Sequence, residues 1–175
     1  MRPAQRLVMT ALAVLAAALA PRPASAGPPD FSGTWVLDLS ASDPVDDLMR
    51  VQGFSFPERQ VAARMAVTQT IVQTPDELRI DVESVAKSRR EVLHLDGREE
   101  TIETEKNGPM LTRSSWAPDG ATLVSQSRVR LSNGAPAVLR VSRQLRDGGR
   151  TLAQRLELEV SGGARYAATR VFRRS

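Results

Sequence analysis

Turn signals recur at near-regular intervals over most of this chain, and they constrain its fold more than any other feature. From residue 64 onward, segments rich in β-forming residues are separated by short runs of Gly, Pro, Asn, Asp and Ser. Signals spaced about every 8–12 residues predict a β-sandwich or a β-barrel. Connections this short favour antiparallel pairing, because parallel strands need long crossovers. The separators are Thr74-Pro75-Asp76-Glu77, Asp96-Gly97, Asn107-Gly108-Pro109, Pro118-Asp119-Gly120, Asn133-Gly134, Asp147-Gly148-Gly149 and Ser161-Gly162-Gly163.

Alternation of apolar and charged residues locates the strands between these turns. Leu78, Ile80 and Val82 alternate with charged residues, which is typical of a half-buried strand. A different pattern follows the first strand, because residues 44–63 have helical spacing around a Gly-Phe-Ser-Phe turn and predict two short helices. The expected strands cover 34–39, 65–73, 78–83, 91–95, 98–105, 110–116, 122–131, 137–146, 151–160 and 165–173.

The sequence therefore predicts an all-β fold, an antiparallel up-and-down β-barrel of about ten strands with a short helical pair between strands 1 and 2. Ten strands are enough to close a barrel, and closure removes the exposed edges of the sheet.

The first 26 residues have the three parts of a secretory signal peptide. Arg2 and Arg6 make the start positive, residues 7–20 form a 14-residue apolar run, and Ala24-Ser25-Ala26 is a small-x-small cleavage site. The run is shorter than the roughly 20 residues that span a bilayer, and a membrane-anchored N-terminus is the alternative. We expect a signal peptide over 1–26, cleaved after Ala26, then a β-barrel domain over 27–175 that is exported to the periplasm or the extracellular space.

Composition excludes several classes of function. Arg2, Arg6 and Arg22 lie before the cleavage site, so the remaining 149 residues carry 21 Lys+Arg against 20 Asp+Glu, and this net charge of +1 gives no strong attraction to nucleic acid. The absence of cysteine excludes thiol catalysis, thiolate metal sites and thiol redox chemistry. With His94 as the only histidine and no phosphate-binding glycine loop, we expect no cofactor, no metal and no enzymatic activity. We also expect a monomer with no transmembrane segment after cleavage.

Two motifs at the ends of the expected domain carry a family resemblance. The first strand begins with Gly33-Thr34-Trp35, and the last contains Arg170-Val171-Phe172. With the helical pair and the strand count, these motifs resemble the calycin superfamily, and within it the fatty-acid-binding-protein branch. The stretch from Asp30 to Trp35 also resembles bacterial secreted lipocalin-like proteins. The resemblance implies a barrel that holds an apolar or amphipathic, fatty-acid-like ligand. Phe172 stands where that branch has tyrosine.

Strand parity and the resemblance together suggest where a ligand would bind. Arg143 shares the apolar parity of its strand, and the family motif turns Arg170 inward, so the two could clamp a carboxylate or phosphate head. The alternatives are that Arg170 stacks on Trp35 to close the base of the barrel, and that Arg143 snorkels out to solvent. The predicted ligand-binding residues are Arg143, Arg170, Tyr166, Phe172, Trp116 and Gln69, and the predicted tail contacts are Leu139, Val141, Leu156, Leu158 and Tyr166.

Aromatic residues leave two further choices open. Trp116 is either part of the core or a ligand wall. Phe54 and Phe56, at the helix turn, either cap a cavity mouth or fix the helices in place.

The leading hypothesis from the sequence is an exported protein that binds a small molecule inside a barrel. The alternative is an envelope interaction or assembly module that uses a filled barrel as its scaffold. A third possibility is a hydrolase or isomerase at the cavity mouth.

Overall fold

The computed structural model describes residues 27–104 and 106–175. The predicted signal peptide lies outside the described residues. Within them the chain forms ten strands, in the order and with the pairing expected of an antiparallel meander.

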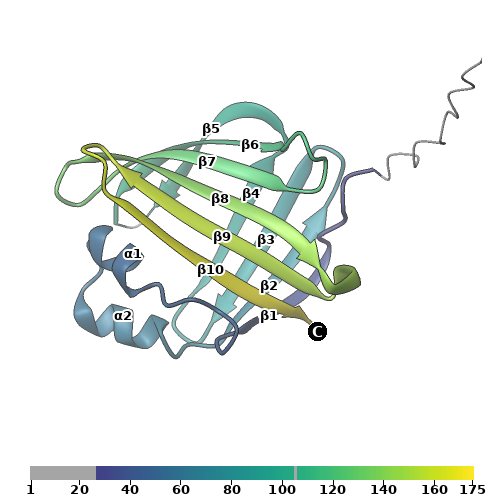
Figure 1. Cartoon of the computed structure of the whole chain (residues 1–175), viewed down its shortest axis with the longest axis horizontal. Helices are drawn as coiled ribbons and strands as arrows, with labels where there is room; N and C mark the ends of the chain where they lie inside the picture. The colour runs from purple at the N-terminus through teal and green to yellow at the C-terminus, as the bar shows by residue number, and fades with distance from the viewer. Residues whose placement is uncertain (1–26, 105) are drawn as a thin grey trace, which may run out of the picture.

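All ten strands belong to one sheet that curves into a nearly closed barrel (Figure 1). Its order is β4-β3-β2-β1-β10-β9-β8-β7-β6-β5, and every neighbouring pair is antiparallel. The predicted fold class is confirmed. The strands are β1 (Gly33–Asp38), β2 (Val67–Gln73), β3 (Glu77–Ser84), β4 (Ser88–His94), β5 (Asp96–Thr104), β6 (Gly108–Trp116), β7 (Leu123–Arg130), β8 (Pro136–Arg146), β9 (Thr151–Val160) and β10 (Arg165–Arg174).

The first strand closes the barrel against the last. In the β1–β10 register Trp35 faces Arg174 and Leu37 faces Phe172. The guanidinium of Arg174 lies 4.3 Å from the Trp35 ring centroid and donates to the carbonyl of Ser32 at 2.8 Å. The expectation that Arg170 stacks on Trp35 is therefore wrong, because the antiparallel register brings the arginine four residues later to the tryptophan.

Gly33 is required at this closure. Its φ is +136°, a conformation that L side chains rarely adopt, and a Cβ at this position would overlap Nη1 of Arg174. The glycine thus adopts the required backbone conformation and leaves room for the Arg174 guanidinium over the buried indole of Trp35.

On the opposite side, β4 and β5 follow one another in the chain but share no ladder. Glu100 of β5 bridges the opening: its Oε1 accepts a hydrogen bond from the backbone N–H of His94 at 3.2 Å, and its Oε2 lies 2.7 Å from His94 Nδ1. Nε2 of the same ring lies 3.1 Å from Glu77 Oε1. Within the described structure, His94 thus serves as a link at the one unpaired seam.

Apolar side chains fill the half of the barrel that includes Trp35. Phe31, before β1, is buried and stacks on Trp116 with ring centroids 5.7 Å apart. The other buried residues of this cluster are Trp35, Leu37, Ile71, Leu78, Ile80, Leu93, Leu95, Leu123, Leu152 and Phe172.

Two short helices, α1 (Asp46–Val51) and α2 (Phe56–Ala62), cover the other end of the barrel (Figure 1). Leu48 of α1 is buried with Ala137, Leu158 and Ala168 of the sheet and with Leu131 of the β7–β8 turn. The helix α2 begins with a capping box between Ser55 and Glu58 and buries none of its residues. The predicted helical pair is confirmed. No helix in the described part of the chain is long and apolar enough to cross a membrane.

Candidate functional site

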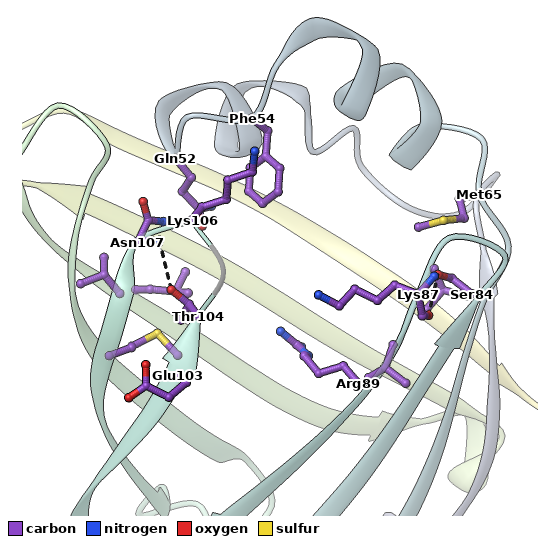
Figure 2. Close-up of a pocket in the computed structure, with 15 residues that line it drawn as sticks. Gln52, Phe54, Met65, Ser84, Lys87, Arg89, Glu103, Thr104, Lys106 and Asn107 are labelled. Carbon is purple, nitrogen blue, oxygen red and sulfur yellow. Dashed lines mark hydrogen bonds between the residues drawn. The ribbon is translucent and has the colours of Figure 1, made fainter.

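A cavity of about 330 Å³ lies at the helix-covered end of the barrel (Figure 2). Most of its apolar residues come from strands, with Phe54 and Met65 from the segments beside the helices, and its polar residues come from turns and from near the ends of strands. The lining residues are Gln52, Phe54, Met65, Val67, Val82, Ser84, Lys87, Arg89, Glu103, Thr104, Lys106, Asn107, Met110, Val129 and Leu139. Because the lining also includes Lys87, Arg89, Glu103 and Lys106, the arrangement can hold a small molecule that has both apolar and polar parts.

Arg143 lies deeper in the barrel on the same strand as Leu139. Four residues along a strand span about 13 Å, and they separate the cavity wall from this arginine. Arg143 is buried, and its Nη1 donates to Ser125 Oγ at 3.3 Å, while its Nε has no hydrogen-bond partner among the described residues. Burial lowers the pKa of Arg143, the negative charge of Glu91 raises it, and the positive charge of Arg89 lowers it. The interior therefore contains a guanidinium whose desolvation is only partly compensated.

Arg143 belongs to an interior polar cluster, which we define as Arg143, Gln154, Arg170 and Gln69. Gln154 lies between the two arginines, since it pairs with Arg143 across β8–β9 and with Arg170 across β9–β10. Gln69 reaches Gln154 from β2, where its Nε2 donates to Gln154 Oε1 at 3.3 Å. The Oε1 of Gln69 is buried and has no partner in the described structure. Three of the six predicted binding residues, Arg143, Arg170 and Gln69, therefore belong to this cluster.

Arg170 is half-buried, and burial lowers its pKa. Its side chain makes no hydrogen bond or ion pair to any other described residue. Both arginines of the predicted clamp therefore face the interior without a carboxylate partner, and a ligand head group could accept hydrogen bonds from them.

Buried hydroxyl groups line the wall next to Arg143, and sequence reasoning missed them. Ser114 Oγ donates to Ser125 Oγ at 2.9 Å, and Thr112 Oγ1 lies 2.8 Å from Ser127 Oγ. All four residues are buried. The available signal was the occurrence of hydroxyl residues at every second position of two consecutive strands.

The other predicted binding residues lie in packed surroundings. Trp116 packs against Phe31, Phe172 belongs to the core around Trp35, and Tyr166 packs with the cluster beneath α1. None of the six predicted binding residues lines the cavity, and among the predicted tail contacts only Leu139 does. The ligand-binding roles of Arg143, Arg170, Tyr166, Phe172, Trp116 and Gln69 stay predictions.

Phe54 and Phe56 differ in position although both flank the helix turn. Phe54 lines the cavity, with Lys106 Nζ 5.5 Å from its ring centroid, whereas the Phe56 side chain is 63% exposed. The same Lys106 pairs with Glu58 Oε1 at 2.8 Å. Lys106 and the Ser55 hydroxyl lower the pKa of Glu58 to about 2. Lys106 thus joins the start of α2 to the β5–β6 turn at the cavity mouth.

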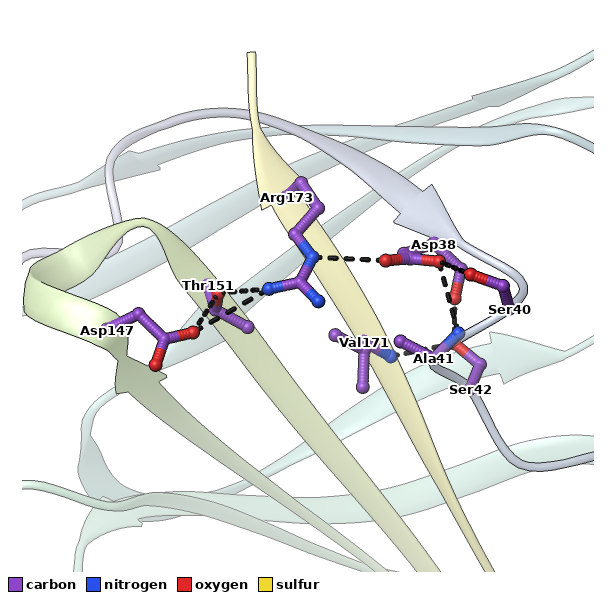
Figure 3. A network of polar contacts seen from close by, with 8 residues as sticks. All are labelled: Asp38, Ser40, Ala41, Ser42, Asp147, Thr151, Val171 and Arg173. Carbon is purple, nitrogen blue, oxygen red and sulfur yellow. Dashed lines mark hydrogen bonds and ion pairs between the residues drawn. The ribbon is translucent and has the colours of Figure 1, made fainter.

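The segment that leads from β1 to the helices is held on β10 by a polar network (Figure 3). The carboxylate of Asp38 accepts hydrogen bonds from Ser40 Oγ at 2.6 Å, Ala41 N at 3.1 Å and Arg173 Nε at 3.1 Å. These donors, with the Ser40 hydroxyl first, lower the pKa of Asp38 to about 2. The backbone N–H of Val171 donates to Ser42 Oγ at 2.9 Å. The network fixes where the helical pair starts, and so positions it over the cavity.

A metal site would need several ligating side chains close together. Within residues 27–104 and 106–175, no group of three or more His, Cys, Asp or Glu side chains lies close enough to hold a metal ion.

Solved structures with the same architecture are known. The chain is similar to a REP1-NXSQ fatty acid transporter, with a TM-score of 0.62 and 22% identity over 82% of this chain and 95% of that chain. It is similar to lipid binding protein 8 of Caenorhabditis elegans, with a TM-score of 0.65 and 15% identity over 83% and 95%. It is also similar to human cRBP IV, with a TM-score of 0.65 and 20% identity over 85% and 100%. The chain shares the fold of these structures. At this level of identity the likeness concerns the fold alone. No protein-family model matches the sequence, and no curated protein matches it.

Proposed function

We propose that the protein is exported and binds a small apolar or amphipathic, fatty-acid-like molecule inside its barrel. The acid head of the ligand would lie against Arg143 and Arg170, and its tail would occupy the cavity beneath the helices. The single observation that carries this proposal is the buried, unpartnered Nε of Arg143, which faces the interior.

A negatively charged ligand would compensate for the buried charge of Arg143. A buried guanidinium without an acid partner is unfavourable, because it has lost its water and gained no counter-charge. A carboxylate beside Nε would supply both the charge and the missing acceptor. The apolar wall formed by Val67, Val82 and Leu139 would surround the hydrocarbon tail. The volume of about 330 Å³ is at the lower end of small-molecule sites.

The structural neighbours support the same class of ligand. One neighbour is described as a fatty acid transporter and another as a lipid binding protein. The alternative function, an envelope interaction or assembly module, requires a filled barrel. The cavity at the helix end favours ligand binding over that alternative.

Native mass spectrometry of the protein isolated from its own envelope tests the binding proposal. We expect the wild type to carry an amphipathic acid and the double variant Arg143→Ala/Arg170→Ala to lose it. Arg155→Ala is the matched control, since this arginine is exposed on β9 and pairs with Glu157 at 3.0 Å. Empty wild-type protein, or equal ligand loading of the double variant Arg143→Ala/Arg170→Ala and the control Arg155→Ala, would argue against the proposal.

Export is tested separately by the mass and the location of the mature chain. We expect a chain that begins at Gly27 and is recovered from the periplasm or the medium as a monomer. Recovery of a full-length chain from the cytosol would refute export without affecting the binding proposal.

A further inference from the structure

We propose that the outer face of the barrel has a second binding site, which takes an organic phosphate monoester. The site is a groove of about 530 Å³ over β5, β6, β7 and β8. Arg113, Arg128 and Arg140 line the groove, and Glu99 is the one carboxylate among its described lining residues. These side chains alternate along their strands with inward-facing ones, so the groove is separate from the interior. The inference does not depend on the ligand proposed for the interior.

The strand registers place the three arginines at the corners of a triangle. Arg113 on β6 and Arg140 on β8 both lie directly opposite Gln126 of β7. Neighbouring strands are about 4.8 Å apart, so the Cα atoms of these two arginines are separated by about 10 Å. Arg128 lies two residues after Gln126 on β7 and is a diagonal neighbour of both, at about 7–8 Å. Arginine side chains are long enough to converge from these positions on one small anion.

Contacts within the groove already hold the guanidinium groups near one another. Arg128 Nη2 donates to Glu99 Oε2 at 2.6 Å, and Arg113 Nε lies 3.4 Å from the same oxygen. Arg140 Nη2 donates to Gln126 Oε1 at 3.3 Å, and Arg140 pairs with no carboxylate in the described part of the chain. Each guanidinium has five N–H donors, so most of these donors are left without an acceptor from the described residues. All three side chains are exposed, and a dissolved molecule can reach them.

The charge of the groove matches a dianion. Three arginines and one glutamate give its lining a net charge of +2. A phosphate monoester has a second pKa of about 6 and therefore carries close to two negative charges at neutral pH. Its terminal oxygens can accept hydrogen bonds from several guanidinium groups at once, and the planar fork of arginine fits them in pairs. A sulfate ester or a carboxylate has a single negative charge and matches the groove less well.

Apolar side chains beside the arginines leave room for the group that carries the phosphate. Val124 lies two residues before Gln126 on the same face of β7, on the side away from Arg128. The lining continues from there through Trp116, where β6 ends, and Pro118. A ring bound here would cover apolar surface that inorganic phosphate would leave in water. The class of ligand that matches the groove is therefore an organic phosphate monoester.

Titration of the lipid-free protein with phenyl phosphate, followed by the backbone amide signals of β6, β7 and β8 in NMR spectra, tests the inference. We expect phenyl phosphate to bind about tenfold more tightly than phenyl sulfate, because it carries a second negative charge. Arg128→Ala should weaken the binding of phenyl phosphate about tenfold, since it removes charge-assisted hydrogen bonds. Arg130→Ala is the matched control. This arginine is exposed on the same face of β7, donates to the Gly134 carbonyl at 2.8 Å and lies outside the groove lining.

Equal weakening by Arg128→Ala and Arg130→Ala would show attraction by net charge alone and would overturn the inference. Equal binding of phenyl phosphate and phenyl sulfate, or no binding of phenyl phosphate, would overturn it as well. Thermal unfolding of each variant without ligand identifies any that have lost the fold. Arg128→Lys then decides, because it keeps the charge but loses the planar fork, and it should also bind phenyl phosphate more weakly than wild type.

Vesicles of phosphatidylcholine, with and without phosphatidic acid, identify the source of the phosphate. Phosphatidic acid presents a phosphate monoester at a lipid surface. Wild-type protein that binds phenyl phosphate and also binds these vesicles, with both weakened by Arg128→Ala, takes a lipid head group. Protein that binds phenyl phosphate but neither kind of vesicle takes a dissolved ester. Binding to vesicles without binding of phenyl phosphate would refute the groove as a site for this class of ligand.

Discussion

Replacing Arg143 by methionine should stabilise the empty barrel while removing the anchor of the ligand. Methionine retains an unbranched side chain and removes the buried charge. Relief of the unpartnered Nε donor is worth about 1–3 kcal/mol, and the lost hydrogen bond to Ser125 costs about 0.5–1.5 kcal/mol. The expected net gain is about 1 kcal/mol, which raises the melting temperature of a domain of this size by about 2–4 °C.

The assay is thermal and urea unfolding of lipid-free wild type and Arg143→Met. Arg155→Met is the control, because the Arg155 side chain is 53% exposed and its pair with Glu157 is a surface ion pair. Its effect should stay within about 0.5 kcal/mol. Addition of decanoate should then raise the melting temperature of the wild type and of the control but not that of Arg143→Met, since a ligand stabilises only the fold that binds it.

A lower melting temperature for lipid-free Arg143→Met than for wild type would refute the reasoning. It would mean that the guanidinium is compensated by interactions that outweigh its desolvation. The anion proposal would then lose its main support.

Three further predictions concern the barrel itself. Gly33→Ala should destabilise the fold by about 1–3 kcal/mol because of the φ of +136°, since the Arg174 guanidinium is the end of a flexible side chain and can move aside; an unchanged melting temperature would contradict this reasoning. Phe31→Ala should cost about 3–5 kcal/mol, measured as a lower urea midpoint, because its buried ring stacks on Trp116. The pKa values of Asp38 and Glu58 are lowered from 3.8 and 4.5 to about 2. Their contribution to stability is therefore complete at neutral pH and declines as the pH falls from about 4 to about 2. Melting temperatures across this pH range should decline less steeply for Asp38→Asn than for wild type. Equal slopes for the two proteins would show that the Asp38 network contributes nothing to stability.

Strand parity was sufficient to predict much of the site. Alternation on β8 places Arg143 on the inward face, and alternation on β10 places Arg170 there, because successive side chains of a strand point to opposite faces. The turn signals likewise predicted the order of the strands. Strand ends were less accurate: β4 begins at Ser88 rather than near residue 91, since Arg89 and Arg90 pair with β3 although their charges hide the alternation.

Partners across strands could not be predicted from local sequence. The sequence offered Arg170 as the partner of Trp35, and the β1–β10 register selected Arg174 instead. The same applies to Gln154, whose position between the two arginines depends on two registers at once. Registers depend on the lengths and conformations of several turns, which a single strand does not contain.

The sequence alone determined the strand count, the helical pair, the parity of the interior arginines and the glycine before Trp35, because each depends on local backbone chemistry and on a period of two. The tertiary structure decided where the barrel is filled and where it is hollow. Buried apolar side chains form the core around Trp35, while a cavity over Val67, Val82 and Leu139 lies at the helix end. It also left the side-chain oxygen of Asn107 buried without a hydrogen-bond partner among the described residues. Whether the core is filled, and whether each polar atom has a hydrogen-bond partner, depends on residues far apart in the chain, so only the folded structure fixes both.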